Sequence, residues 1–492
     1  MKSRLFATST LALLCMSGCT TTRSVSPLGE QSAVEAADKA YRQLPSSLPA
    51  YNSAVRVLAE RLEKTGPAGF GETLKQIGVG FSYPQTGLTL KHVEVSEEPA
   101  DPNAFGVPVV LEYDAANSPI YPPEGLLVDA AAVCRKIDGK FQLSLLHAQK
   151  NLTVNSRPMR LAIDPAGASN HLKSRTKRLA ASGFISMIRP ESMKRKPRIY
   201  LLDPYDSEKT PLLMVHGLQS TPIAFAKLVN ALRADPEIRS KYQIWQFYYP
   251  SGAPVLVNAA ALRESLKETL ATLDPDGSAR ANHRIVVIGH SMGGVISHTL
   301  ASSSGGKVWS SVFQVPPSQL KGDPAAIRNF EHIAFFSRDP HVGRVIFMAA
   351  PHRGSPMADS FIGRLGTSLT RLGPMAETGF SILTLMNNAV MHRDAAEFSA
   401  GGRYSAVRTL SSKSTALIAV ANLPIPIPFH NIIGQRRPGP KQGGSDGVVP
   451  YWSSHLDGAD SESIVRSGHN IIKNPEAIAE VIRILRQHQN TL

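Results

Sequence analysis

The stretch Arg284–Ser303 reads RIVVIGHSMGGVISHTLASS, and the fold prediction starts from it. A β-branched run, Ile285–Ile288, is followed by the pentapeptide Gly-His-Ser-Met-Gly at 289–293 and then by a segment of small residues. This order predicts a buried strand, a tight turn and a helix, a context in which the turn lifts a serine hydroxyl above the edge of a sheet. A pentapeptide this short also occurs by chance, so its meaning depends on the rest of the chain.

The regions on either side of this stretch, over residues 199–492, alternate in the same way. Short apolar runs alternate with segments of helical pattern, which predicts an α/β fold: a mostly parallel sheet with helices on both faces. The expected strands are Leu212–Val215, Tyr242–Tyr249, Ile285–Ile288, Val345–Ala349, His430–Gly434 and Ile464–Arg466, and the expected helices are Ala224–Arg233, Ala259–Leu273 and Pro475–Gln487.

Sites in such sheets form where the carboxyl ends of the strands meet. The residues that follow shortly after expected strands, and so are expected to converge, are His216, Ser291, His352, Asp446 and His469.

A serine hydroxyl becomes an effective nucleophile when a base takes its proton and an anion orients that base. In the fold that carries this pentapeptide, the acid follows the serine in the chain and the histidine comes last. Asp446 and His469 fit that order and are the predicted acid and base for Ser291. The alternative bases are His290, His352 and His455, and the alternative acids are Asp457 and Asp460.

Two backbone N–H groups are expected to donate hydrogen bonds to the oxyanion of a tetrahedral intermediate. One belongs to Met292, directly after the serine, and the other to Leu218, after His216-Gly217. The alternative for His-Gly is an ordinary turn after a strand. No cofactor is expected, and no cluster of Cys and His has the spacing of zinc ligands.

Five pieces of the chain, spread over residues 199–492, resemble the α/β-hydrolase superfamily, and within it the bacterial lipases and lipase-like serine esterases. They are LLMVHGL (212–218), IVVIGHSMGG (285–294), VIFMAAPHRGS (345–355), SDGVVP (445–450) and SGHN (467–470). The resemblance implies a catalytic domain with Ser291, Asp446 and His469 as its triad and Leu218 and Met292 as its oxyanion hole.

The substrate class that the resemblance implies is an acyl ester or lipid. Since the superfamily carries several chemistries on one scaffold, acyltransferase, amidase and thioesterase activities remain alternatives. A non-catalytic interaction lipoprotein of the cell envelope is a further alternative.

The first 19 residues have the pattern of an export signal. Two basic residues precede the apolar run Leu5–Cys15, which is too short to span a bilayer. Met-Ser-Gly-Cys at 16–19 resembles the lipobox of bacterial lipoproteins, which implies removal of residues 1–18 and lipidation of Cys19. Thr20, where an aspartate would retain the protein in the inner membrane, implies the outer membrane. A plainly cleaved secretory signal is the alternative.

Residues 19–30 are expected to be a tether, and residues 31–170 a separate accessory domain of α+β or mostly β class. Two helices are expected within Gln31–Lys64, with a break at Pro45–Pro49. The expected strands are Leu88–Val95, Val107–Tyr113 and Phe141–Leu146. Because no motif in this region carries a chemical mechanism, a structural or partner-binding role is expected.

Only one of the three cysteines is expected in the folded body of the protein. Cys15 and Cys19 lie in the predicted signal, so Cys134 has no partner for an intramolecular disulfide. We expect it to be a small buried hydrophobic residue.

A basic linker is expected at residues 171–198, in a chain of 492 residues with a net charge of +14. It is either a solvated linker or a contact with an anionic lipid surface. Nucleic acid is not expected as a partner, because the export signal argues against it and no aromatic residues are interleaved with the basic ones. The basic residues are Lys173, Arg175, Lys177, Arg178, Arg189, Lys194, Arg195, Lys196 and Arg198.

Residues 356–428 are too many for a plain connection between strands. Phe361–Leu372 and Phe380–Met391 are apolar and prone to form helices, and the proline-rich Leu423–Pro428 follows. We expect this insertion to form either a lid or acyl-binding cap over Ser291, or additional packing helices.

Overall fold

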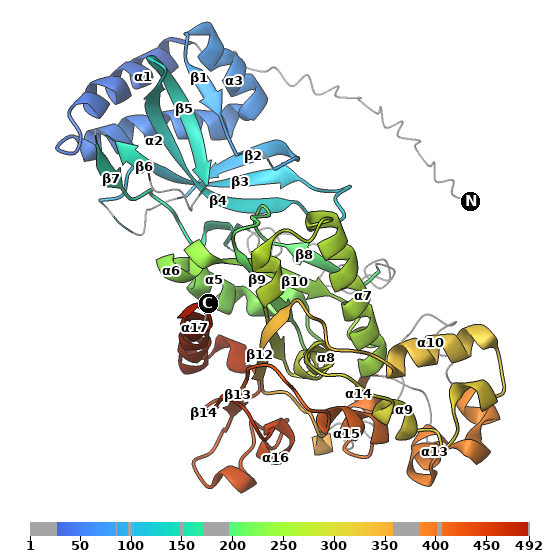
Figure 1. Ribbon diagram of the computed structural model, residues 1–492. Helices are drawn as coiled ribbons and strands as arrows, with labels where there is room; N and C mark the ends of the chain where they lie inside the picture. The colour runs from blue at the N-terminus through green and yellow to red at the C-terminus, as the bar shows by residue number, and fades with distance from the viewer. Residues whose placement is uncertain are drawn as a thin grey trace, which may run out of the picture.

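The structure is a computed structural model that describes residues 27–84, 86–96, 101, 103–147, 152–154, 156–168, 170–171, 196–357, 383–400 and 406–490. The first part of the chain forms a five-stranded sheet and the two-stranded ribbon of β6 (Leu152–Val154) and β7 (Arg157–Met159). The second part forms a seven-stranded sheet, which lies below the first in Figure 1.

The seven-stranded sheet has the order β14-β13-β12-β11-β9-β10-β8. Each neighbouring pair is parallel except β10 with β8. The central strands β9 and β11 are buried throughout, as parallel strands covered on both faces must be. The strands are β8 (Arg198–Leu201), β9 (Thr210–Val215), β10 (Tyr242–Tyr248), β11 (Ile285–His290), β12 (Val342–Met348), β13 (Phe429–Gly434) and β14 (Ser461–Val465).

Helices cover both faces of this sheet (Figure 1). On one face lie α7 (Val255–Leu273) and α8 (Met292–Ala301), and on the other α5 (Ala226–Ala234), α6 (Pro236–Lys241) and α17 (Pro475–Asn490). Alternate residues of β9 belong to different cores: Leu213 packs with the first group and Leu212 with the second. The predicted α/β architecture is therefore confirmed, and β11 is joined to α8 by the sharp strand-to-helix turn that the sequence predicts.

The last strand differs from its prediction. Ile464–Arg466 was expected, whereas β14 is Ser461–Val465 and half-buried over its first four residues. It is the edge strand of the sheet, so its outer polar residues carry no apolar signal. The short helices of this part are η1 (Pro222–Phe225), η2 (Arg280–Arg284), α9 (Lys307–Ser310), η3 (Pro317–Gln319), η5 (Lys441–Gly443), α16 (Tyr451–Ser454) and η6 (Ile471–Lys473).

The five-stranded sheet belongs to the α+β class, one of the two classes expected for this region. Its order is β1-β5-β4-β3-β2, and the helices α1, α2 and α3 precede these strands in the chain. The break between the first two helices is found as predicted. The elements are α1 (Pro27–Arg42), α2 (Leu48–Thr65), α3 (Pro67–Gln76), β1 (Gly80–Ser82), β2 (Thr89–Val95), β3 (Val107–Asp114), β4 (Leu126–Ile137) and β5 (Lys140–His147).

The long central strand β4 was missed by sequence reasoning. It contains three consecutive alanines, Ala130–Ala132, and alanine is depleted in strands. Cys134 lies in this strand and is a fully buried free thiol, as expected.

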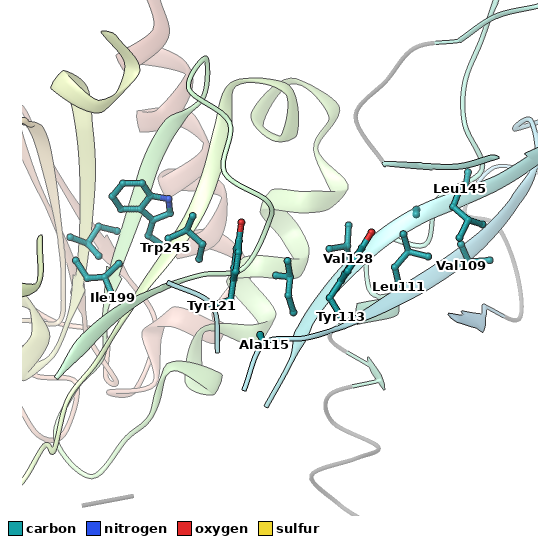
Figure 2. Packing of buried hydrophobic residues seen from close by; sticks show 14 of the residues in the cluster. Val109, Leu111, Tyr113, Ala115, Tyr121, Val128, Leu145, Ile199 and Trp245 are labelled. Atoms are coloured by element: carbon teal, nitrogen blue, oxygen red, sulfur yellow. The ribbon is translucent and has the colours of Figure 1, made fainter. Parts of the chain in front are cut away.

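The apolar interior of the first sheet continues into the second. Figure 2 shows Tyr121 between Tyr113 of β3 and Trp245 of β10, all in one cluster of buried residues. The backbone N–H of Leu201 in β8 also donates to the carbonyl of Ile120, at 2.9 Å. The two sheets therefore share a core, and the predicted boundary at residue 170 remains a prediction.

The insertion contributes short helices beside α7 and α8, at the lower right of Figure 1. The described helices are η4 (Asn388–Val390), α13 (Arg393–Ala400), α14 (Ala406–Thr409) and α15 (Thr415–Ala421). Ala395 of α13 and Val420 of α15 pack with α9 and with α10 (Pro324–Ala334) in a separate apolar cluster, whereas Ala406 of α14 and Leu417 of α15 belong to the main core.

Four predictions fall wholly or largely outside the described residues. They concern the signal with Cys19, the tether at 19–30, most of the basic linker, and the piece Phe361–Leu372. The end of the tether was predicted wrongly, because residues 27–30 form the first turn of α1. Within the ranges that the structure describes, no helix has the length and apolar character to cross a bilayer.

Candidate active site

Ser291 sits on the turn between β11 and α8 in a conformation that side chains rarely adopt. Its φ is 54° and its ψ is −129°. Its backbone N–H donates to the carbonyl of Met348 in β12, at 2.9 Å, which ties the turn to the neighbouring strand. Strain of this kind persists only where the surroundings hold it, and it is concentrated at functional sites.

The glycines around Ser291 are required by close approach. A Cβ atom on Gly293 would lie 2.1 Å from the carbonyl oxygen of Val215, and one on Gly289 would lie 2.6 Å from the Cα of Gly294. A Cβ atom on Gly217 would lie 2.8 Å from the Cβ of Ser291. The sequence Gly-x-Ser-x-Gly therefore allows the turn to pack directly against the end of β9.

Ser291, His469 and Asp446 form a hydrogen-bonded chain. The Nε2 atom of His469 lies 2.8 Å from the Oγ atom of Ser291, and its Nδ1 atom lies 2.7 Å from Oδ2 of Asp446. A carboxylate only accepts, so the proton of a neutral ring sits on Nδ1, and Nε2 is left to accept from the serine hydroxyl. This is the geometry in which an imidazole can take the serine proton.

The carboxylate of Asp446 is held by its own loop. Its Oδ1 atom accepts from the backbone N–H groups of Val448 and Val449, at 2.8 and 2.7 Å. Its side chain is 1% exposed, whereas that of His469 is 21% exposed. The acid is therefore buried and fixed, while the imidazole reaches the surface of the site.

The alternative acids and bases have other partners. His455 contacts Glu462 and Asp457, and Asp460 pairs with Arg344 at 3.7 Å. His352 is buried beside His298, with ring centroids 5.4 Å apart. The predicted acid and base are thus the ones that the structure brings to Ser291.

The two predicted oxyanion donors flank the serine. Met292 is the first residue of α8, so its N–H points out of the positive end of a helix. Leu218 follows Gly217, which touches Ser291. Within the described ranges, no backbone carbonyl accepts from either N–H.

His216 shapes the loop that carries Leu218. Its ring stacks on that of Tyr249, with centroids 4.2 Å apart, and its carbonyl accepts from the Tyr249 hydroxyl. Burial lowers the pKa of His216 to about 4, so the ring is neutral near pH 7. His216 was expected at this edge of the sheet, and its role there is to support the loop that carries Leu218.

Sequence reasoning missed the contacts that two residues of the site make. The Nε2 atom of His290 lies 2.8 Å from the backbone carbonyl oxygen of His469. Gly434 ends β13, and a Cβ atom there would lie 2.8 Å from the Cβ of Asp446. Both depend on loops distant in the sequence. The only sequence signal for these two residues was their position next to predicted site residues. His290 lies in the pentapeptide, and Gly434 ends the strand before the acid.

An apolar cavity of about 70 Å³ lies between α7, α9, α10 and the insertion helices. Its walls include Val255, Leu256, Val308, Phe330, Ala395 and Leu417. At one end, the N–H of Val255 donates to the Thr409 hydroxyl at 3.1 Å. Just before this end of α7, the Ser251 hydroxyl accepts from the N–H of Gln219, the residue after Leu218, at 3.1 Å. These two hydrogen bonds involve Ser251 and Val255, four residues apart in the chain, and neither Ser291 nor Leu218 lines the cavity.

No group of three or more His, Cys, Asp or Glu side chains is arranged to hold a metal ion in the part of the chain that the structure describes.

Comparisons with known proteins find neither a matching family model nor a matching curated protein. Solved structures do match at low identity. The mature form of the Bacillus licheniformis lipase BlEst2 is 16% identical with a TM-score of 0.36, and the match covers 58% of this chain and 97% of that chain.

Two clostridial proteins match in the same way. A lipase-esterase related protein from Clostridium acetobutylicum ATCC 824 is 13% identical, with a TM-score of 0.30 and coverage of 59% and 100%. EstA from Clostridium botulinum is 12% identical, with a TM-score of 0.32 and coverage of 54% and 83%. Scores this low lend nothing to an assignment of function, which has to rest on the geometry.

Proposed function

We propose that this protein is a membrane-anchored serine hydrolase that cleaves carboxylic esters of acyl groups, lipids among them. The observation that carries the proposal is the hydrogen-bonded chain from Ser291 through His469 to Asp446. It starts at a serine held in a rare backbone conformation, and it ends at a buried carboxylate.

The reaction follows from the positions of the protons. As the Oγ atom of Ser291 attacks the acyl carbon, its proton passes to Nε2 of His469. The bond from the acyl carbon to the leaving alcohol then breaks, and His469 returns the proton to that alcohol. Water repeats both steps on the acyl-enzyme, which releases the carboxylic acid and restores Ser291. Asp446 accepts from the Nδ1 atom of His469 throughout and stabilises the charged imidazole.

The oxyanion of each tetrahedral intermediate would bind between the N–H groups of Met292 and Leu218. Donors aimed at developing charge in a site that excludes water stabilise the transition state more than the ground state. Removing one such donor from a hydrolase costs a factor of about 10²–10³ in kcat.

The apolar cavity supports an acyl group as the part of the substrate bound by the insertion. One buried water needs about 10–15 Å³, so a cavity of about 70 Å³ is several times larger than a water site. This favours short acyl chains held between α7 and the insertion helices, and it supports the acyl-binding cap over plain packing helices.

The cell-envelope location is proposed from the sequence alone. The lipobox-like segment supports lipidation of Cys19 and retention at the outer membrane. Two or three acyl chains anchor a protein firmly where one does not. In cells fed a labelled fatty acid, the wild type should take up the label and Cys19→Ala should not. Equal labelling of both would refute the anchor.

The experiment that tests the proposed reaction is turnover of a matched substrate panel. Carboxylic esters of increasing acyl length are offered to wild type and to Ser291→Ala, beside an amide and a thioester of the same acyl group. We expect ester hydrolysis by the wild type, highest for short chains, and its loss in the variant. Preferential cleavage of the amide or thioester would favour the alternative activities, and transfer to an added alcohol would favour an acyltransferase. No turnover of any substrate would favour a non-catalytic role.

A further inference from the structure

The hydrogen bond between His290 and the His469 backbone has no place in the proton transfers described above. His290 ends strand β11 directly before Ser291 and is 5% exposed. Its ring lies against that of His469, with centroids 5.3 Å apart. The contact joins positions 179 residues apart in the chain.

The protonation state of His290 follows from this contact. A carbonyl oxygen only accepts hydrogen bonds. The Nε2 atom of His290 therefore carries a proton and donates a hydrogen bond to the backbone carbonyl of His469. The Nδ1 atom is buried and has no hydrogen-bond partner among the described residues. A second proton there would have no acceptor, and burial lowers the pKa of His290 to about 4. The ring is therefore a neutral donor at the pH at which a serine hydrolase works.

Two consecutive residues of the turn thus hold the same residue of a distant loop. Ser291 contacts the imidazole of His469, at 2.8 Å, and His290 contacts its carbonyl, also at 2.8 Å. The side-chain bond exchanges its proton during turnover, whereas the backbone bond does not. The second contact therefore keeps the loop in register with the serine while the first one is broken and remade.

We infer that His290 is a positioning residue, which fixes the His469 loop so that the imidazole stays in line with Ser291 throughout the cycle. This inference rests on the proposed function. A misplacement of about 1 Å at a reacting centre can cost a factor of about 10² in rate. Loss of the His290 donor should therefore lower kcat by about 10–100-fold and leave KM within about twofold, because His290 is not placed to touch the substrate.

The test compares three substitutions at one position. His290→Leu removes the donor. His290→Gln places an amide nitrogen the same number of bonds from the backbone as Nε2, and His290→Asn places a donor that is too short to reach. We expect kcat to fall in the Leu and Asn variants and to recover in the Gln variant to within about fivefold of wild type. Comparable loss in all three, or in none, would overturn the inference.

A matched control is His298→Leu. His298 is also fully buried beside the turn, on α8, and burial also lowers its pKa to about 4. It contacts the carbonyl of Leu423, at 3.4 Å, and not His469. This variant should keep the wild-type kcat, so an equal loss there would mean that any buried polar deletion damages the site. If His290→Leu does not fold, the comparison of Gln with Asn still decides.

Failure of the inference and failure of the proposed function give different results. The rate of covalent labelling by a fluorophosphonate probe is measured in wild type first. If the wild type is not labelled, the proposed function fails. If the wild type is labelled and His290→Leu is labelled at the same rate, the positioning role alone fails.

Discussion

Ser291 can adopt its strained conformation because its neighbours have no side chains in the way. The tightest of these approaches is at Gly293, where an added Cβ atom would also lie 2.5 Å from the carbonyl oxygen of His216. Both contacts are to backbone atoms of β9 and its following loop, which cannot move without shifting the sheet. The geometry of the nucleophile therefore depends on residues that take no part in the chemistry.

Gly293→Ala should unfold the turn or the protein. The added methyl would force apart α8 and β9, so we expect poor yield of folded protein, or a folded form with activity below about 1% of wild type, since misplacement by about 1 Å already costs about 10² in rate. Soluble yield, thermal unfolding and ester turnover measure this. The control is Gly69→Ala in α3, where nothing lies within 4 Å. There an alanine should stabilise the helix by about 0.5–1 kcal/mol. A fully active Gly293→Ala would contradict the packing described.

Among the individual residues of the site, the sequence predicted those whose order along the chain is characteristic of such a site. Ser291, Asp446 and His469 could be picked because each follows an apolar run and the acid lies between the serine and the histidine. His290 and Gly434 could not, because their roles arise only when distant loops meet. From the sequence alone, a histidine that donates to a distant backbone carbonyl cannot be distinguished from a histidine that only packs in a core.

The strands of the central sheet were predicted well where they are buried on both faces. Runs such as Ile285–Ile288 and Leu212–Val215 are continuously apolar, and that pattern is strong. β4 and β14 were harder for opposite reasons. The first is rich in alanine and is set by its partners β3 and β5, and the second is a polar edge strand. Such strands form because they pair with neighbouring strands, and a local sequence pattern contains no information about that pairing.

The insertion helices give a prediction at the scale of elements. Ala416 on α15 lines the apolar cavity. Ala416→Phe should fill most of it, so hydrolysis of six-carbon acyl esters should fall by about tenfold or more relative to acetyl esters. A single methylene in a pocket is already worth about 1–3 kcal/mol. The ratio of kcat/KM values for the two esters measures the change.

The control for the cavity lies on the same helix. Ile418 is 37% exposed and is not among the residues that line the cavity, so Ile418→Phe should leave chain-length preference unchanged. If Ala416→Phe folds and its preference matches that of wild type, the cavity is not where the acyl chain binds.

Over the whole molecule, buried neutral histidines link stability to pH. Burial lowers the pKa of His216, His290, His298 and His488 to about 4 and that of His430 to about 3. In the unfolded chain, a histidine titrates near 6.5. Between these values the unfolded chain binds more protons, so stability is complete above about pH 6.5 and is lost as the pH falls toward 4.

The size of this effect is comparable with a normal margin of stability. A shift of about 2.5 pKa units is worth about 3 kcal/mol for each histidine, against a typical total of about 5–15 kcal/mol. Asp129 acts in the opposite direction, because burial raises its pKa to about 6 and its contribution is lost as the pH rises through that value. Burial likewise lowers the pKa of His147 to about 4 and that of His352 well below its ordinary value, so the histidines outnumber Asp129 and acid destabilisation should dominate.

Thermal unfolding followed from pH 7 to pH 4 measures this balance. We expect Tm to fall steeply below about pH 6 and the fold to be lost before pH 4. A Tm that stays constant between pH 6.5 and 4.5 would mean that these rings are protonated in the folded state or are not buried as described.

The continuity between the two sheets was not visible in the sequence. The first sheet was expected to be separate, because no motif or pattern links residues 31–170 to the rest. The link is instead a cluster of ordinary apolar residues around Tyr121, together with buried charges. Arg233 of α5 lies 3.5 Å from the carboxylate of Asp129 in β4 and 2.7 Å from that of Asp203. A shared core of this kind depends on shape, and a single sequence contains no signal for it.

The central claim is that Ser291 is an activated nucleophile, and one measurement addresses it directly. The full-length protein is treated with a fluorophosphonate probe, digested, and analysed by mass spectrometry to find the modified residue. The hydrogen-bonded chain through His469 to Asp446 predicts a single adduct on the peptide that contains Ser291, absent from Ser291→Ala and much slower to form in His469→Ala. An unlabelled wild type, or labelling that survives in Ser291→Ala, would contradict it.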